Sequence, residues 1–117
     1  VRDYIHVVDL ATGHLKALEK IQAKKITKEL AGGSGVHIWN LGSGIGSSVL
    51  QVIKAFEHAS GVKIPYSIKG RRYGDIASCW ANPEKAQREL GWKTNCDLSE
   101  MVVDSWRWQH SNPIGYK

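Results

Sequence analysis

The chain has 117 residues, 42% of them hydrophobic and 23% charged, which is typical of a folded globular domain and excludes a fibrous or disordered chain. A domain of this size buries only about two thirds of its unfolded surface, so we expect a modest core. The net charge of +5 allows an anionic partner, but the basic residues are dispersed, which argues against a nucleic-acid-binding surface.

The first third of the chain predicts a helix and a strand. Hydrophobic residues recur at helical spacing over 8–21, interrupted only by Gly13, and predict an amphipathic helix. The basic, glycine-containing stretch 24–35 predicts a solvated loop. Segment 36–41 is short, favours β-structure and is followed by Gly42, which predicts a buried strand and a glycine turn.

The middle of the chain predicts a second helix and an edge strand. Ser48 stands three residues before Gln51, which is the spacing of a capping box, and the helix that it opens should end at Gly61. Segment 62–68 alternates hydrophobic and polar residues and contains Pro65, which predicts a short strand at the edge of a sheet.

Two more helices are predicted near the carboxyl end. Asn82 as N-cap and Pro83 in the first turn begin one helix, which Gly91 ends, and the cap-like segment 97–100 begins the other. We therefore expect an α/β fold class, α+β if the chain folds alone, with four helices and two or three short strands. These strands are too few to complete a doubly wound sheet, so we treat 1–117 as one domain.

Metal sites and membrane spans are not indicated. Cys79 and Cys96 lack Cys-x-x-Cys spacing and the five histidines are scattered, so we expect reduced thiols in a cytoplasmic protein. No apolar run reaches the roughly 18 to 20 residues that a membrane span needs. The chain starts at Val1 instead of Met and runs directly into a structured pattern, which suggests an internal start.

The turn at 42–46 is superficially like a dinucleotide-binding fingerprint, because it places three glycines between a predicted strand and a helix. That fingerprint requires Gly-x-Gly-x-x-Gly and an acidic residue about 20 positions later, at the end of a second strand. Here the third glycine comes one residue early, and 62–68 ends without an acid. We interpret the turn as one that lets the backbone approach another group closely, of which a nucleotide base or ribose is one candidate.

Two polar clusters have side chains suited to a nucleotide. Arg71 and Arg72 could contact phosphate oxygens and Asp75 could accept hydrogen bonds from a sugar, although an exposed Arg–Asp pair on a turn explains the same residues. Segment 2–6 combines a cation, an acid, an aromatic ring and an imidazole, which a strand end with a buried aromatic residue and a helix-capping acid also explains. The sequence shows no nucleophile and base in a recognisable local arrangement.

Read together, five segments resemble the UDP-galactose 4-epimerase family, also called UDP-glucose 4-epimerases, of the extended short-chain dehydrogenase/reductases. They are Arg-Asp-Tyr-Ile-His at 2–6, Trp-Asn-Leu-Gly-Ser-Gly at 39–44, Arg-Arg-Tyr-Gly-Asp at 71–75, Ala-Asn-Pro at 81–83 and Trp-Arg-Trp-Gln at 106–109. The resemblance covers essentially the whole chain. The segment at 2–6 is shared with other members of the superfamily. The segments at 71–75 and 106–109 narrow the resemblance to the epimerases.

The resemblance implies an isomerase in which NAD, bound by an amino-terminal Rossmann domain, takes hydride from C4 of a hexose while the Tyr of a Tyr-x-x-x-Lys motif removes a proton. This chain has neither that motif nor the glycine-rich start of a Rossmann domain. It therefore looks like the carboxyl-terminal, nucleotide-sugar-binding part of such an enzyme, inactive and without cofactor by itself. The parent would be a cytoplasmic homodimer of galactose metabolism that acts on UDP-glucose and UDP-galactose.

The family's substrate contacts carry over to residues of this chain. By resemblance, Arg2 and Arg72 would hold the diphosphate, Asp75 would accept hydrogen bonds from the uridine ribose, and Val49 would pack on the uracil, with Tyr4 nearby. Two other readings stay open: a relative that acts as a dehydratase or decarboxylase on another nucleotide sugar, and a basic nucleic-acid-binding module without enzymatic activity.

Cys79 occupies the family position that lines the hexose pocket, where some members carry Tyr. The smaller side chain would leave room for a 2-acetamido group, so the resemblance suggests that the complete enzyme also interconverts UDP-N-acetylglucosamine and UDP-N-acetylgalactosamine. The alternative is that Cys79 is a small buried apolar residue.

Overall fold

A computed structural model of the chain describes residues 1–23 and 36–116, so the loop predicted at 24–35 lies outside the described residues. The helices and strands are, in chain order, β1 (Arg2–Asp3), α1 (Val7–Gln22), β2 (Gly46–Ser47), α2 (Val49–Ser60), α3 (Glu84–Leu90) and α4 (Leu98–Ser111). The α/β class with four helices is confirmed, and each helix lies within two residues of its predicted bounds.

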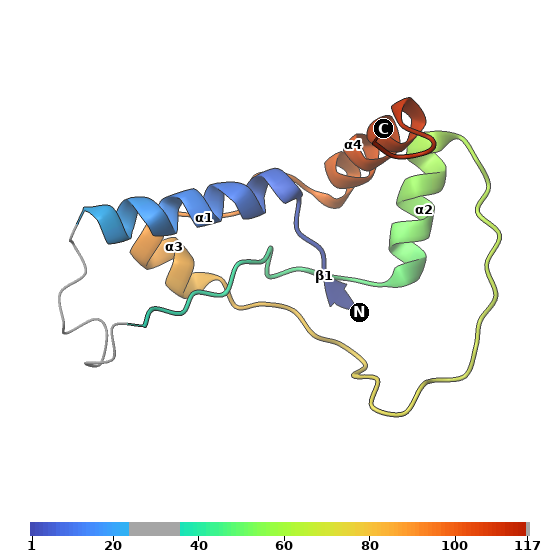
Figure 1. Ribbon diagram of the computed structural model, residues 1–117. Helices are drawn as coiled ribbons and strands as arrows, with labels where there is room; N and C mark the ends of the chain where they lie inside the picture. The colour runs from blue at the N-terminus through green and yellow to red at the C-terminus, as the bar shows by residue number, and fades with distance from the viewer. Residues whose placement is uncertain (24–35, 117) are drawn as a thin grey trace.

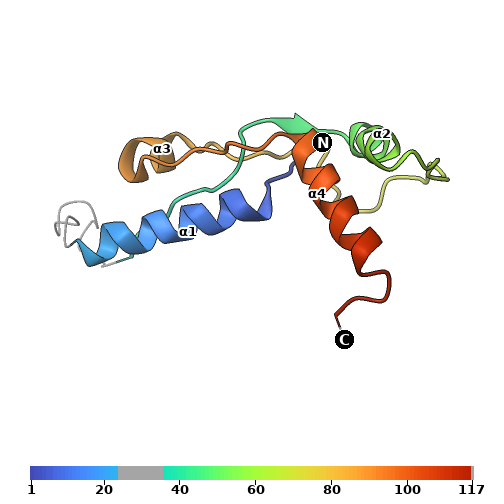
Figure 2. The ribbon, with the colours of Figure 1, turned by 90° about the horizontal axis from the view of Figure 1, so that it is seen from above.

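The helices form two separate pairs. α1 packs with α3 at one end of the molecule and α2 packs with α4 at the other, while β1 lies between the pairs (Figures 1 and 2). The radius of gyration is 18.0 Å, whereas a compact domain of about 100 residues has about 13 Å. The molecule is therefore elongated, and residues 61–83 run around its edge as a wide arc (Figure 1).

Two helices begin at the local signals predicted for them. At α2, Ser48 Oγ accepts the Gln51 N–H at 3.2 Å and Gln51 Oε1 accepts the Ser48 N–H at 2.7 Å, which closes the predicted capping box. Asp97 and Glu100 form the same reciprocal pair at the start of α4. Gly61 ends α2 with a left-handed backbone, φ 70°. These signals are short-range, which explains why they can be read from sequence.

The other two helix starts differ from expectation in detail. His6 caps α1, since its Nδ1 accepts the Val8 N–H at 3.1 Å, and the acidic cap expected in this region is wrong. A neutral imidazole nitrogen has the free lone pair that a cap needs. At α3 the N-cap position belongs to Pro83, one residue later than predicted, while Asn82 Oδ1 accepts the Glu84 N–H at 2.9 Å.

Neither predicted strand forms. The observed sheet pairs β1 and β2 antiparallel, with Arg2 opposite Ser47 and Asp3 opposite Gly46. Residues 36–41 and 62–68 form neither helix nor strand and are not paired in a sheet within the described part of the chain. The strand predictions were wrong because a strand needs a neighbour's N–H and C=O groups, which local pattern cannot provide.

The core is small and lies between α1, α3 and the chain that follows α3. Its buried members are Ala86, Leu90 and Trp92, and partly buried residues packed against them are Ile5, Ala17, Trp39 and Leu41. Beyond this cluster, the buried hydrophobic side chains of the described residues include only Val102 on α4. None of the helices in the described ranges is long and apolar enough to cross a membrane.

Gly13 interrupts the hydrophobic pattern of α1 because another segment approaches the helix there. A Cβ atom at Gly13 would lie 2.7 Å from Leu41 Cδ1 and 3.2 Å from Trp92 Cε2. The Trp92 indole N–H reaches the same helix and donates to the Asp9 carbonyl at 3.0 Å and to Thr12 Oγ1 at 3.2 Å. Close packing on α1 thus fixes two segments that are distant in sequence, at Leu41 and at Trp92 just after α3.

Candidate functional site

Three segments that are distant in sequence meet at Arg2. The backbone of Arg2 is paired with Ser47 of β2 and also forms a parallel bridge with Cys79. Next to this bridge, the Cys79 N–H donates to the Val1 carbonyl at 3.1 Å. β1 therefore places the predicted diphosphate ligand Arg2 directly beside Cys79, the predicted hexose-pocket residue.

The Arg2 guanidinium lies toward the chain that carries the other predicted ligands. Its Nη1 donates to the carbonyls of Val1 at 2.8 Å and Ile76 at 2.9 Å. Arg2 and Cys79 line one open cavity of about 550 Å³, whose other lining residues include Trp39, Asn40 and Trp80. Arg2 remains exposed there, so its guanidinium is accessible to a ligand.

Arg72 and Asp75, which the resemblance assigns to different parts of a nucleotide, contact each other. Arg72 Nε lies 3.2 Å from Asp75 Oδ2 and Nη2 lies 3.3 Å from Oδ1. This hydrogen-bonded pairing holds the pKa of the Asp75 carboxyl below its usual value, and the nearby charge of Arg2 adds to the effect. The Arg72 side chain is 86% exposed, so solvent screens the pair and it contributes little to the stability of the fold.

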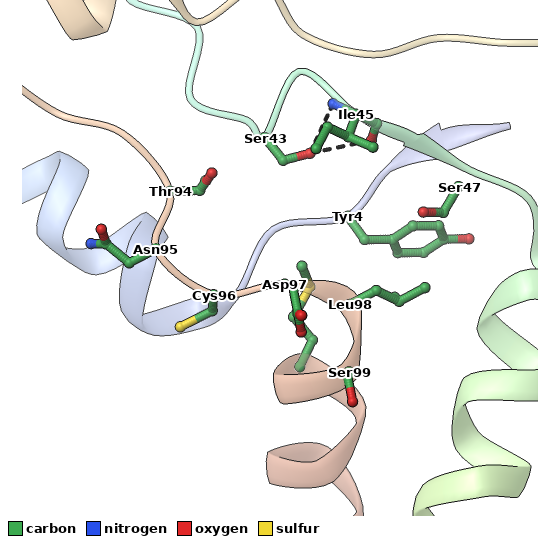
Figure 3. Close-up of a pocket in the computed structure, with 11 residues that line it drawn as sticks. Tyr4, Ser43, Ile45, Ser47, Thr94, Asn95, Cys96, Asp97, Leu98 and Ser99 are labelled. Atoms are coloured by element: carbon green, nitrogen blue, oxygen red, sulfur yellow. Dashed lines mark hydrogen bonds between the residues drawn. The ribbon is translucent and has the colours of Figure 1, made fainter.

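Val49 and Tyr4 lie elsewhere around β1. Val49 is the first residue of α2, follows β2 closely and is 62% exposed. Tyr4 lines a different cavity, of about 450 Å³, with Ser47 and Leu98 among its other lining residues (Figure 3). The structure therefore brings Arg2 and Cys79 to one cavity, and Asp75 lies near enough for the charge of Arg2 to lower its pKa. Arg72, Asp75 and Tyr4 do not line that cavity.

The glycine turn at 42–46 binds a carboxylate of the protein itself. Asp3 accepts the backbone N–H groups of Ser43 and Gly44, each at 3.0 Å, and the Ser43 hydroxyl at 2.6 Å. Burial raises the pKa of Asp3, but these hydrogen bonds and one from the Ala81 N–H outweigh it, so the net pKa is lowered. The stabilisation from this carboxylate is therefore present above the pKa of an ordinary Asp and is lost as the pH falls through the lowered value.

This arrangement also tests the turn as a cofactor site. A dinucleotide fingerprint binds pyrophosphate through free backbone N–H groups at a glycine turn. Here Asp3 already occupies the N–H groups of Ser43 and Gly44, and a Cβ at Gly42 would lie 2.6 Å from Asp3 Oδ2. The residues of this turn do not fit NAD. The prediction that the backbone of this turn lies close to another group is correct, and that group is the Asp3 side chain instead of a nucleotide.

Sequence reasoning missed the role of Asp3, which it treated as a possible helix cap. Its partners lie 40, 41 and 78 residues further along the chain, at Ser43, Gly44 and Ala81. One signal was available: a turn with several glycines leaves backbone N–H groups that need an acceptor. The sequence could not indicate which acid would supply it.

Among the described residues, His6 and Cys96 are two further ionisable side chains whose surroundings bear on catalysis. His6 Nε2 lies 3.3 Å from Asp104 Oδ2 while Nδ1 accepts the Val8 N–H, so both ring nitrogens are engaged. Burial and then the Asp9 carboxylate raise the pKa of the Cys96 thiol, which disfavours the reactive thiolate. No group of three His, Cys, Asp or Glu in the part that the structure describes could hold a metal ion.

Comparison with known proteins identifies the family. A family model described as GDP-mannose 4,6 dehydratase matches residues 1–105. The chain belongs to this family, which lies among the extended short-chain dehydrogenase/reductases. Its sequence relatives include UDP-glucose 4-epimerases of Bacillus subtilis (strain 168), 56% identical over the whole chain, and of Homo sapiens, 53% identical over 99% of it.

A solved structure supports the same relationship. The UDP-glucose 4-epimerase of Stenotrophomonas maltophila, crystallised with NAD and formylated UDP-arabinopyranose, superposes on 95% of the chain with a TM-score of 0.82 and 42% identity. The chain covers 30% of that structure, and 32% and 31% of the Bacillus and human relatives. It thus spans about a third of the length of these UDP-glucose 4-epimerases, and the expected resemblance to the epimerases is confirmed.

Proposed function

We propose that this chain is the carboxyl-terminal, UDP-sugar-binding part of a UDP-glucose 4-epimerase. The observation that carries the proposal is the meeting of three segments at β1, where Arg2 lies beside Cys79 and donates to Ile76, next to Asp75. Two cations, a sugar-binding carboxylate and a small pocket residue are the groups that a nucleotide sugar requires. Sequence identity of more than half to UDP-glucose 4-epimerases supports this assignment.

In this proposal the nucleotide supplies the affinity. A hexose that must present both faces to a hydride donor cannot be held tightly, so binding energy has to come from UDP. Arg2 and Arg72 hold the diphosphate, Asp75 binds the ribose and Val49 packs on the uracil, with Tyr4 at the edge of the site. Arg72 exchanges its exposed contact with Asp75 for the phosphate, and little stability is lost because solvent already screens that contact.

The chemical step would depend on the rest of the protein. This chain has no Tyr-x-x-x-Lys sequence, and its glycine turn is occupied by Asp3. We therefore assign NAD, which carries the hydride when bound, to a Rossmann domain outside this chain, and we expect this chain alone to be inactive. The complete enzyme is proposed to be a cytoplasmic homodimer that interconverts UDP-glucose and UDP-galactose in galactose metabolism.

The same proposal extends to N-acetylated substrates through Cys79. Its side chain is exposed at the cavity shared with Arg2. This exposure favours a pocket-lining residue over a small buried apolar one. The complete enzyme should therefore also interconvert UDP-N-acetylglucosamine and UDP-N-acetylgalactosamine.

Calorimetric titration with UDP, UDP-galactose and NAD tests the assignment. The chain should bind UDP and UDP-galactose with similar affinity and should not bind NAD, whereas the full-length protein should bind all three. NAD binding by the chain itself would contradict the reading of the glycine turn. If the full-length protein bound neither UDP nor UDP-galactose, the proposed function would be wrong.

A further inference from the structure

The Asp3 carboxylate is saturated with hydrogen bonds. Oδ1 accepts the backbone N–H of Ser43 at 3.0 Å and its hydroxyl at 2.6 Å, and Oδ2 accepts the N–H groups of Gly44 at 3.0 Å and Ala81 at 3.1 Å. Each oxygen therefore has two donors. A single side chain joins the glycine turn to the segment that follows Cys79.

These contacts fix both neighbours of Arg2. The glycine turn runs directly into β2, whose Ser47 lies opposite Arg2, and Ala81 lies two residues beyond Cys79, which bridges Arg2 from the other side. Gly42 permits this approach, because a Cβ atom there would lie 2.6 Å from both Ala81 Cβ and Asp3 Oδ2. The Asp3 carboxylate of β1 thus binds the two other segments that meet at Arg2.

Apart from the carboxylate, the arrangement rests on single hydrogen bonds, such as those from Arg2 Nη1 to the Ile76 carbonyl and from the Cys79 N–H to the Val1 carbonyl, and on a short strand pair. The β1–β2 pair is two residues long on each strand, and a two-stranded ribbon of that size is at best marginally stable in water. The contact of β1 with Cys79 is an isolated bridge. Asp3 is the side chain that ties both segments flanking Arg2 to each other, so the placement of the Arg2 backbone depends on it in addition to these single bonds.

We propose that Asp3 is a positioning residue for nucleotide recognition, which holds Arg2 between β2 and Cys79 so that its guanidinium can meet the diphosphate. This inference rests on the proposed function and adds a residue that touches no ligand. It makes UDP affinity depend on Asp3 through Arg2.

The hydrogen-bond pattern indicates which substitution is informative. In Asp3→Asn one oxygen becomes an NH₂ group, which in either amide orientation points donors at two existing donors. Asp9 is a matched control, because it is also a buried carboxylate that accepts backbone N–H groups. Here a single oxygen, Oδ2, accepts the N–H groups of both Asn95 and Cys96, each at 3.0 Å. Asp9→Asn can therefore keep these two bonds.

The test is a double-mutant cycle on UDP affinity in the full-length protein, measured by calorimetry, with Asp3→Asn, Arg2→Lys and the double variant. Asp3→Asn should weaken UDP binding about tenfold while Asp9→Asn stays within about twofold. The double variant should bind UDP no more than about twofold more weakly than Arg2→Lys alone, because coupled residues are not additive. NAD affinity should be the same in all variants.

The outcomes separate this inference from the proposed function. If Arg2→Lys weakens UDP binding but Asp3→Asn does not, or if the two losses simply multiply, Asp3 is not a positioning residue for Arg2. If Arg2→Lys has no effect, the proposed function fails as well. Should Asp3→Asn not fold, Ser43→Ala removes one of the four donors, and a folded Ser43→Ala protein with unchanged UDP affinity would overturn the inference.

Discussion

The region around Trp92 and the region around Arg72 are held in place by different means. Trp92 is buried against α1 and α3 and its indole N–H donates to two atoms of α1. In contrast, every residue from 65 to 74 is exposed, and the Arg72–Asp75 pair is the side-chain contact that orders this turn. Packing stabilises the first region, whereas a few hydrogen bonds to β1 hold the second.

The residues that stabilise the fold and the residues proposed to bind the ligand therefore lie in different regions. Buried apolar area and satisfied polar groups determine whether the α1–α3 region folds. Exposed charged groups contribute little to folding but keep their full capacity to bind an anion. Substitutions in the two regions should therefore have effects that barely overlap, and four predictions test this separation.

The largest effect is expected for Trp92→Ala. Removing this buried ring creates a cavity in a small core and leaves the Asp9 carbonyl and Thr12 without their indole donor. The free energy of unfolding should fall by about 3–5 kcal/mol, as measured by urea denaturation followed by circular dichroism. Trp92→Phe keeps most of the apolar volume and should lose much less; equal losses would mean that packing is not what holds this region.

Arg72→Ala should weaken UDP binding without changing the stability of the fold. UDP binding by the full-length protein should weaken by about 2–5 kcal/mol if the lost contact is charge-assisted and becomes buried in the complex. Stability should not change, because the side chain is 86% exposed in the free protein. Arg88→Ala on α3, which removes another exposed arginine, is the control. Unchanged UDP affinity in calorimetry would remove Arg72 from the site.

Asp9 tests the hydrogen-bonded part of the packed region. Asp9→Ala leaves the N–H groups of Asn95 and Cys96 without their acceptor, and each unpaired donor should cost about 1–3 kcal/mol of stability. Asp9→Asn should cost less because one oxygen can still accept both. The two variants are compared by thermal unfolding, and an Asn variant as unstable as the Ala variant would show that the negative charge is what matters.

The smallest effect is expected for Cys79→Tyr, and it should appear in specificity. Tyrosine at the cavity shared with Arg2 should lower kcat/KM for UDP-N-acetylgalactosamine about tenfold more than for UDP-galactose. The four substrates are assayed with the full-length enzyme, and Cys79→Ser, which keeps the pocket small, is the control. Equal losses on both substrate pairs would contradict the assignment of Cys79 to the hexose pocket.

The sequence by itself determined the helices and the family. Ser48 with Gln51 and Asp97 with Glu100 close capping boxes within one turn, and Gly61 and Gly91 end helices through their own left-handed backbone. Such signals act over a few residues, so no knowledge of the rest of the fold is needed. The segments that resemble the epimerases were likewise readable without coordinates.

Only the tertiary structure decided the strands and the assembly of the site. Segments 36–41 and 62–68 have strand-like patterns but are not paired in a sheet in the described ranges, whereas Arg2–Asp3 and Gly46–Ser47, which carry no such pattern, do pair. Asp3 meets groups 40 to 78 residues away. Pairing and hydrogen bonding of this kind depend on which distant groups arrive at the same place, and that is a property of the folded chain as a whole.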